Sequence, residues 1–158
     1  MNNIILKTIL LSILPVTELR GGIPYAIAND INPFLAYIIC VGVNILALPI
    51  VFLFLEFLHP LLLKIDIYQT LFNKFVVKTR KKIGIKIQKY GFWGLMIFVM
   101  IPLPVTGAYT GSFAAWLFNI SKKKAFISVS LGLIISGIIV TIISLSGKEA
   151  FDFLIKRV

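Results

Sequence analysis

The sequence predicts an all-α integral membrane protein, arranged as an inverted repeat of a re-entrant helical hairpin plus a transmembrane helix, with an amphipathic cytoplasmic helix between the repeats. Three observations lead to this fold class. Hydrophobic residues make up 59% of the 158 residues and the mean hydropathy is +0.99, well above a soluble domain's apolar share of roughly 45–50%. Two apolar stretches, 34–58 and 125–146, are each long enough to cross a bilayer. The letters Leu-Pro-Val-Thr occur at both 14–17 and 103–106.

The two copies of this motif are 89 residues apart, and the same offset aligns residues beyond the motif. It places Ala36 over Ala125 and Tyr37 over Phe126. We therefore expect a single membrane domain over 1–158. Its parts are repeat 1 at about 1–60, a basic linker at about 61–91, repeat 2 at about 92–147 and an amphipathic tail at 148–158.

The first apolar run, Ile4 to Leu14, is too short to cross a membrane, since about 11 residues of helix reach only half-way through a hydrocarbon core of about 30 Å. Pro15 and Gly21-Gly22 then interrupt the chain, and the returning run from Ile23 to Ala28 is also short. We expect a re-entrant hairpin with Pro24 in the first turn of the returning helix. A single kinked crossing by the whole segment is the alternative.

The first complete span is expected over Phe34–Leu58, with a kink at Pro49. After it, residues 64–89 combine seven lysines and Arg80 with apolar residues at helical spacing, which is typical of an amphipathic helix on a membrane surface. Basic segments beside transmembrane helices stay in the cytoplasm. We therefore place 64–89 and Lys122–Lys124 on the cytoplasmic side of a multi-pass protein of the inner or plasma membrane.

The second repeat follows the same order: a short apolar run over 92–101, prolines at 102 and 104, a loop over 106–111, a returning run over 112–118 and a long span over 125–146. Within that span, Ser128, Gly132 and Ser136 form a stripe of small residues that predicts close helix packing. If each hairpin returns to its own side, the long helices run in opposite directions and the hairpin tips meet near the bilayer midplane. This arrangement also predicts both chain termini on the outer side.

Glu18 and Arg20 are the acid and the base of the predicted loops, and placing either in hydrocarbon costs about 2.5 kcal/mol or more. This cost indicates a site for substrate and protons. The other side chains expected there are those of Thr17, Thr106, Tyr109, Thr110 and Asn44. Loop backbone freed for binding is expected at Pro15, Gly21, Gly22, Pro24, Pro102, Pro104, Gly107 and Gly111. The returning helices, beginning near Ile23 and Ser112, would direct their positive ends at an anionic head group.

Two of these assignments have alternatives that the sequence leaves open. Glu18 and Arg20 could form a stationary buried ion pair that holds the loop in place. Asn44, in the middle of its helix, could hydrogen-bond a neighbouring helix instead of lining the cavity.

The basic residues lie between apolar segments, so the formal net charge of +10 indicates membrane lipids with anionic head groups as partners, and not nucleic acid. No Ser-His-Asp arrangement, HExxH, Walker loop or dinucleotide fingerprint occurs, so we expect neither an enzyme nor a cofactor. No metal site is expected, because Glu56 and His59 share a helix face without a third ligand.

The stretch Pro15-Val16-Thr17-Glu18-Leu19-Arg20-Gly21-Gly22-Ile23-Pro24, paired with Pro102-Leu103-Pro104-Val105-Thr106-Gly107-Ala108, resembles the small multidrug export protein family of bacteria and archaea, which is similar in turn to the DedA/VTT membrane proteins. The resemblance covers essentially the whole chain. It implies two re-entrant hairpins that meet inside the bilayer, with Glu18 and Arg20 as the loop acid and base. The DedA proteins are implicated in moving lipids, including polyprenyl-phosphate carriers, and in proton-dependent drug tolerance. Their second loop also carries arginines, whereas this chain has no charged residue between Lys89 and Lys122.

We therefore expect a membrane transporter or lipid translocase that moves an amphipathic, anionic substrate of the lipid-phosphate type, with proton coupling through Glu18. An exporter of cationic amphiphiles is the rival interpretation, and a structural membrane scaffold with a lipid-binding basic helix is a third. Two complete spans and two hairpins enclose little space, so we also expect a homodimer.

Overall fold

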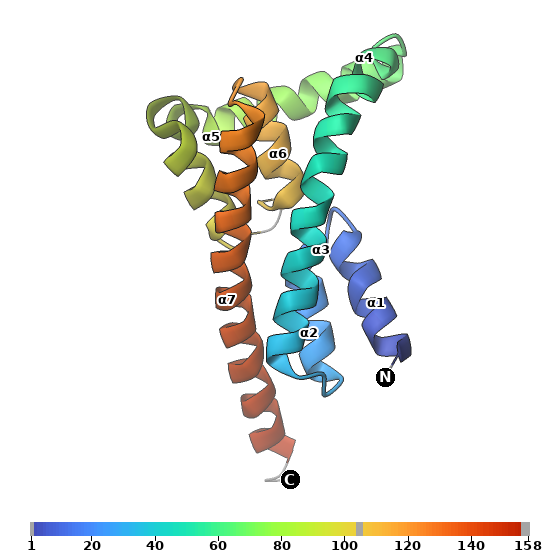
Figure 1. Ribbon diagram of the computed structural model, residues 1–158, viewed down its shortest axis with the longest axis vertical. Coiled ribbons are helices and arrows are strands. Elements are labelled where there is room, and N and C mark those ends of the chain that lie inside the picture. Colours follow the sequence, from blue (N-terminus) through green and yellow to red (C-terminus); the bar gives the residue numbers. More distant parts are fainter. Residues whose placement is uncertain (1, 104–105, 156–158) are drawn as a thin grey trace.

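The computed structural model describes residues 2–103 and 106–155, and the side chains of these residues except 71, 75, 78–89 and 149–155. The described chain is all helical, with 85% helix and no strand. Its helices are α1 (Asn2–Ile13), α2 (Glu18–Ala28), α3 (Pro33–Leu53), the π-helical turn η1 (Phe54–Leu58), α4 (His59–Leu62), α5 (Asp66–Met100), α6 (Ala108–Leu117) and α7 (Lys122–Ile155) (Figure 1).

In the part of the chain that the structure describes, two helical stretches are long and apolar enough to cross a membrane, Pro33–Leu62 and Lys122–Lys148. The first begins where the sequence predicts, because the Asn32 side chain accepts a hydrogen bond from the amide of Phe34 at 2.9 Å and Pro33 suits a first turn. The second continues beyond the predicted span, so that the predicted tail starts as part of α7. α3 and α7 run in opposite directions along the long axis of the molecule (Figure 1).

Two pairs of short helices lie beside these long ones. α1 and α2 pack against each other and against α3, and the turn over 14–17 that joins them lies about half-way along α3 (Figure 1). α6 packs against α5, which is broken at Gly91 by a backbone conformation of φ +49° and ψ −111°. The first part of α5 lies across one end of the molecule, and the part after Gly91 turns inward (Figure 1).

Both returning helices begin earlier than the sequence predicts. α2 begins at Glu18 and not near Ile23, and α6 begins at Ala108 and not near Ser112. The prediction of loop backbone is therefore wrong at four positions, which are helical: Gly21, Gly22, Pro24 and Gly111. Pro15, Pro102 and Gly107 lie in turns or extended chain, while Pro104 lies outside the described residues.

Gly22 of α2 provides space for neighbouring helices and not a bend. A Cβ atom on Gly22 would overlap Ser12 Oγ on α1 and lie 2.9 Å from Cys40 Sγ on α3. Sequence alone could not separate the two roles, because both require a residue without a side chain. The helix also contains Pro24, whose missing N–H leaves the carbonyl of Arg20 without an intrahelical donor.

The same backbone turn ends α2 and α6. Asp30 and Asn119, which are 89 residues apart, both have left-handed backbones, with φ of +61° and +54°. In each turn the next amide donates back to the carbonyl five residues earlier, from Ile31 to Ala26 at 3.0 Å and from Ile120 to Ala115 at 2.9 Å. The offset of the sequence repeat therefore recurs in the backbone.

Small residues let α7 approach the last part of α5 closely. Ser128 Oγ donates to the carbonyl of Phe92 at 2.6 Å, and a Cβ atom on Gly132 would lie only 2.9 Å from the carbonyl oxygen of Met96. Ser136 is fully buried. The packing role predicted for this stripe of small residues is confirmed.

An aromatic cluster attaches the first part of α5 to the rest of the molecule. The buried ring of His59 lies 4.1 Å from that of Phe72 and 5.1 Å from that of Trp116, measured between centroids, and its Nδ1 is 3.0 Å from the Tyr68 hydroxyl.

Among the described residues, no group of three His, Cys, Asp or Glu is placed to hold a metal. The cationic side chains of the linker from Lys78 to Lys89 lie outside the described part.

Ion pairs connect the two halves of the chain at both ends of the bundle. Lys122 Nζ lies 2.5 Å from the Glu56 carboxylate, and Lys148 Nζ lies 2.6 Å from Asp30 and 3.1 Å from the carbonyl of Ile27. The hydrogen bond from Lys148, together with its charge, lowers the pKa of the Asp30 carboxyl. Asp30 is 88% exposed, and Lys122 and Glu56 are 67% and 47% exposed, so water screens both pairs and each contributes little to stability.

Gly132→Ala should destabilise the fold. The added methyl group meets backbone and Val99 side-chain atoms at 3.0 Å or less, and overpacking of this kind costs about 1–3 kcal/mol. Gly147→Ala on the same helix is the control, because a Cβ there meets nothing within 4 Å and alanine favours a helix by about 1 kcal/mol over glycine. Thermal unfolding in detergent, followed by circular dichroism, should give a lower Tm for the first variant only. Equal shifts would contradict the close packing.

Candidate functional site

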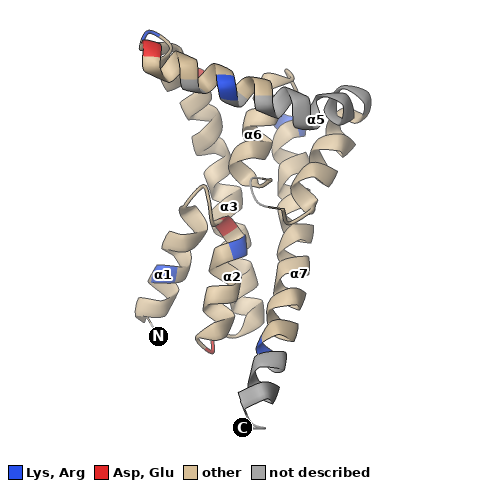
Figure 2. Cartoon of the chain, turned by 180° about the vertical axis from the view of Figure 1, so that it is seen from behind, with Lys and Arg blue, Asp and Glu red and all other residues tan. Residues whose placement is uncertain are grey.

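The turn before α2 and the segment before α6 meet about half-way along the molecule. The acidic and basic residues of α2 lie at this level in Figure 2, within a bundle that is otherwise uncharged there. Glu18 is only 3% exposed and the Arg20 side chain is 17% exposed. A buried carboxylate and guanidinium are stable only if polar groups of the protein surround them.

The Glu18 carboxylate caps the N-terminal end of α6. It accepts hydrogen bonds from the backbone amides of Ala108 at 3.3 Å and Tyr109 at 3.4 Å. First-turn amides have no acceptor within their own helix, and a negative charge there is stabilised by the helix dipole. A side chain of the first hairpin thus completes a helix of the second. The sequence analysis expected these amides at the start of α6 to bind an anionic head group. In the structure they bind the carboxylate of Glu18 instead.

Gly107 leaves the space that this carboxylate fills. A Cβ atom at Gly107 would overlap the Glu18 carboxyl group. The backbone of Gly107 is extended, with φ of −149°, so glycine is needed here for space and not for conformation. Gly107 is also the repeat equivalent of Glu18, 89 residues later, and this correspondence is the sequence signal that could have identified its role.

Arg20 holds the same segment of the second hairpin. Its Nη2 donates to the carbonyl oxygen of Thr106, and to Thr106 Oγ1 at 3.0 Å. Its Nη1 lies 4.0 Å from Glu18 Oε2. Its Nε is buried without a hydrogen-bond partner in the described structure. Arg20 therefore contacts both the acid of its own helix and the loop of the other hairpin.

The remaining predicted hydroxyl groups hold the turns in shape. Tyr109 Oη donates to the carbonyl of Ile13, which joins α6 to the end of α1. Thr17 Oγ1 donates to the carbonyl of Leu11. Thr110 Oγ1 accepts from the amide of Gly107 at 2.9 Å. The structure thus brings Thr17, Thr106, Tyr109 and Thr110 together with Glu18 and Arg20.

The hydrogen bonds of Asn44 go to backbone carbonyls of α1 and α3 and not to these residues. It is fully buried, and its Nδ2 donates to the carbonyls of Cys40 at 2.8 Å and Ser12 at 3.3 Å. The bond to Ser12 joins α3 to α1, which is the helix-bonding alternative for this residue. Sequence reasoning missed Thr8 and Ser12, both buried on the same side of α1. Their spacing of four residues was the available signal.

Glu18 is also conformationally strained. Its φ of +49° lies in the left-handed region, which costs a residue with a side chain about 1–2 kcal/mol. Strained residues persist where the surrounding structure determines them, and they are frequent at functional sites. Here the two hydrogen bonds from backbone amides to the Glu18 carboxylate hold the residue in this conformation.

A family model described as small multi-drug export protein matches residues 18–139, more than three quarters of the chain. The match begins at Glu18 and includes both sides of the contact between α2 and residues 106–109. It confirms the family predicted from the motifs. No curated protein and no solved structure matches the chain.

Glu18→Gln should weaken the contact between the hairpins. Its amide NH₂ would face a backbone N–H of α6, so one buried donor would lose its partner, at a cost of about 1–3 kcal/mol. Glu56→Gln is the control, because the Glu56 carboxylate is 47% exposed and its ion pair contributes at most about 1 kcal/mol. Denaturant unfolding in detergent should show a larger loss of stability for Glu18→Gln than for Glu56→Gln. Equally small losses would show that the Glu18 carboxylate does not cap α6.

Gly107→Ala should expel the Glu18 carboxylate while leaving its charge intact. Without this acceptor, the amides of Ala108 and Tyr109 should exchange with solvent about tenfold faster or more, as expected for a lost hydrogen bond to a charged group. Hydrogen exchange by mass spectrometry measures this at α6. Gly42→Ala, where a Cβ meets nothing within 4 Å, should leave α6 unchanged. Unaltered hydrogen exchange in Gly107→Ala would show that the Glu18 carboxylate does not occupy the space beside Gly107.

Proposed function

The chain belongs to the small multi-drug export protein family, and we propose that it is a membrane transporter whose substrate path crosses the contact between the two hairpin tips. The observation that carries this proposal is the hydrogen bonding of Glu18 to the first amides of α6. It concentrates charge and helix ends at mid-depth in an apolar bundle. Transporters commonly bind substrate at such a junction of broken helices.

The proposal includes two re-entrant hairpins related as an inverted repeat. α1 has 12 residues and α2 has 11, so each reaches about 18 Å, roughly half of a bilayer of about 40 Å with its head groups. In Figure 1 the α1–α2 pair and the pair formed by α6 and the end of α5 lie in opposite halves, with their turns toward the middle. This arrangement supports entry of the hairpins from opposite membrane faces.

Charge supports an orientation with residues 64–89 and Lys122–Lys124 in the cytoplasm. Both termini then lie on the outer side. One copy has two membrane-capable stretches to surround the path, so a homodimer is part of the proposal.

An anionic amphiphile, such as a lipid phosphate, is the substrate class that the contacts favour. Glu18 is almost fully buried and already accepts two backbone hydrogen bonds, so it has little to offer a cation. Arg20 has a partly exposed side chain and an Nε without a partner in the described structure. An anion that displaced the Glu18 carboxylate would also meet the positive end of α6.

A one-for-one exchange of anions explains how protons would enter the cycle. The head group would take the position of the Glu18 carboxylate at the amides of Ala108 and Tyr109, and Glu18 would leave that position protonated. The charge at the contact then changes little, which avoids the cost of an unpaired buried ion. Departure of the carboxylate would release α6 from α2, so the tips could separate and let the substrate pass.

Transport into proteoliposomes tests this function, with labelled polyprenyl phosphate and a cationic dye compared with and without a pH gradient. We expect the phosphate to move and the gradient to change its rate. Arg20→Gln should slow it about tenfold or more, because a charged hydrogen bond to substrate is worth about 1.5–3 kcal/mol. Glu18→Gln should remove the effect of the gradient. Lys7→Gln, at an exposed base outside the contact, should change neither.

Two other results would assign a different function. Movement of the dye, with Glu18→Gln more harmful than Arg20→Gln, would support the export of cationic amphiphiles that the family's description favours. If neither compound moves and only removal of the linker lysines impairs the protein in cells, the scaffold interpretation replaces transport.

A further inference from the structure

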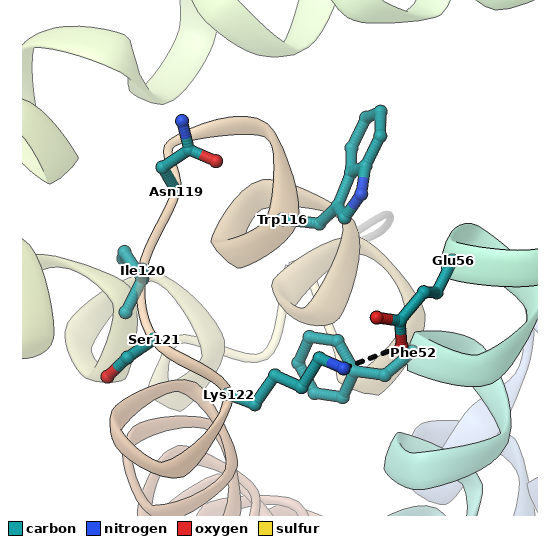
Figure 3. A pocket seen from close by; sticks show the side chains of 7 residues that line it. All are labelled: Phe52, Glu56, Trp116, Asn119, Ile120, Ser121 and Lys122. Atoms are coloured by element: carbon teal, nitrogen blue, oxygen red, sulfur yellow. Dashed lines mark hydrogen bonds and ion pairs between the residues drawn. The ribbon is translucent and has the colours of Figure 1, made fainter.

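A cavity of about 290 Å³ lies away from the hairpin tips, where the first membrane-capable stretch ends and α7 begins. Figure 3 shows its lining, which is Phe52, Glu56, Trp116, Asn119, Ile120, Ser121 and Lys122. The end of α6 and the turn after it form one side. Since both membrane-capable stretches have an end here, the cavity lies at the depth of lipid head groups.

The charged groups of this cavity are a carboxylate and an ammonium. Glu56 Oε2 and Lys122 Nζ lie 2.5 Å apart, and the two side chains are 47% and 67% exposed. Such an exposed pair contributes little to stability, so a ligand that offers each group a new partner can separate them easily. Glu18 differs in this respect, because it is buried and has two backbone donors.

The walls suit a small amphipathic group. Phe52, Trp116 and Ile120 provide apolar surface, while Asn119 and Ser121 add an amide and a hydroxyl group. α7 begins at Lys122, and the first-turn amides of a helix, which lack acceptors in that helix, favour phosphate. Glu56 lies in the π-helical turn η1, a backbone irregularity that is frequent at functional sites.

We propose that this cavity binds a zwitterionic head group in which a primary ammonium and a phosphate lie a few atoms apart. The ammonium donates to Glu56 and the phosphate accepts from Lys122, so the present ion pair is exchanged for two matched pairs. A simple anion would face the Glu56 carboxylate and a simple cation would face Lys122, so neither matches both groups. The volume is at the small end of ligand sites, which suits a head group whose chains remain in the bilayer. The site goes beyond the transport path and does not depend on it.

Native mass spectrometry of the detergent-solubilised full chain, with one added lipid at a time, tests the site. Phosphatidylethanolamine should bind about tenfold more tightly than phosphatidylglycerol, which lacks the ammonium, because one charged hydrogen bond is worth that much. It should exceed phosphatidylcholine similarly, since a quaternary ammonium has no N–H to donate. Phosphatidylglycerol binding as tightly as phosphatidylethanolamine would overturn the proposal. Free phosphoethanolamine binding as tightly as the lipid would support the same chemistry with a soluble source.

Variants separate ligand binding from the structural effect of the ion pair. Glu56→Gln and Lys122→Gln should each weaken phosphatidylethanolamine binding about tenfold, whereas Lys123→Gln, at an exposed neighbour outside the lining, should not. The reversed pair, Glu56→Lys with Lys122→Glu, keeps an ion pair and the wild-type Tm but should lose the lipid, because its chain fixes the order of the two charges. Wild-type affinity in the reversed pair would overturn the proposal.

Discussion

The carboxylate of Glu18 at the start of α6 is the contact on which the rest of the arrangement depends. A carboxylate that is 3% exposed is costly to bury unless its charge is matched by several donors. Two amides come from the second hairpin and one guanidinium from its own helix. Each hairpin alone would be incomplete, because one would keep a bare buried charge and the other an uncapped helix end. Together they satisfy both requirements, and this explains why two short helices can end in the middle of an apolar bundle.

The contacts between the halves differ with depth. At both ends of the bundle, the exposed pairs Glu56–Lys122 and Asp30–Lys148 join residues that water can also solvate. At the centre, the contact of Glu18 and Arg20 with the second hairpin is almost closed to water. Breaking an exposed pair costs little, whereas breaking the central contact leaves buried polar groups without partners. In the proposed transport cycle, the central contact can therefore open only if its buried charges gain new partners. Protonation neutralises Glu18, and the substrate anion takes the place of its carboxylate.

Much of this was predictable, because the signals are strong over many residues. Apolar composition and span length identified the two membrane-capable stretches, the motif identified the family, and the lone acid and base drew attention to Glu18 and Arg20. The helix starts were mispredicted, since a glycine that admits a neighbouring helix, as Gly22 does, looks in sequence like one that bends the chain. The capping of α6 by Glu18 joins residues about 90 positions apart, and local patterns do not report such pairs. The hairpin orientation, the wider likeness to the DedA/VTT proteins and the homodimer stay predictions.

The overlap between Glu18 and the space above Gly107 limits how alike the two halves of the chain can be. The two positions are equivalent in the repeat, and only one of them can carry an acid. Two identical units would bring a pair of negative charges into one seat, with no room for either. The contact therefore requires two different residues at these positions, with an acid at Glu18 and no side chain at Gly107. The two halves are complementary in shape and charge, and two copies of either half could not form this contact.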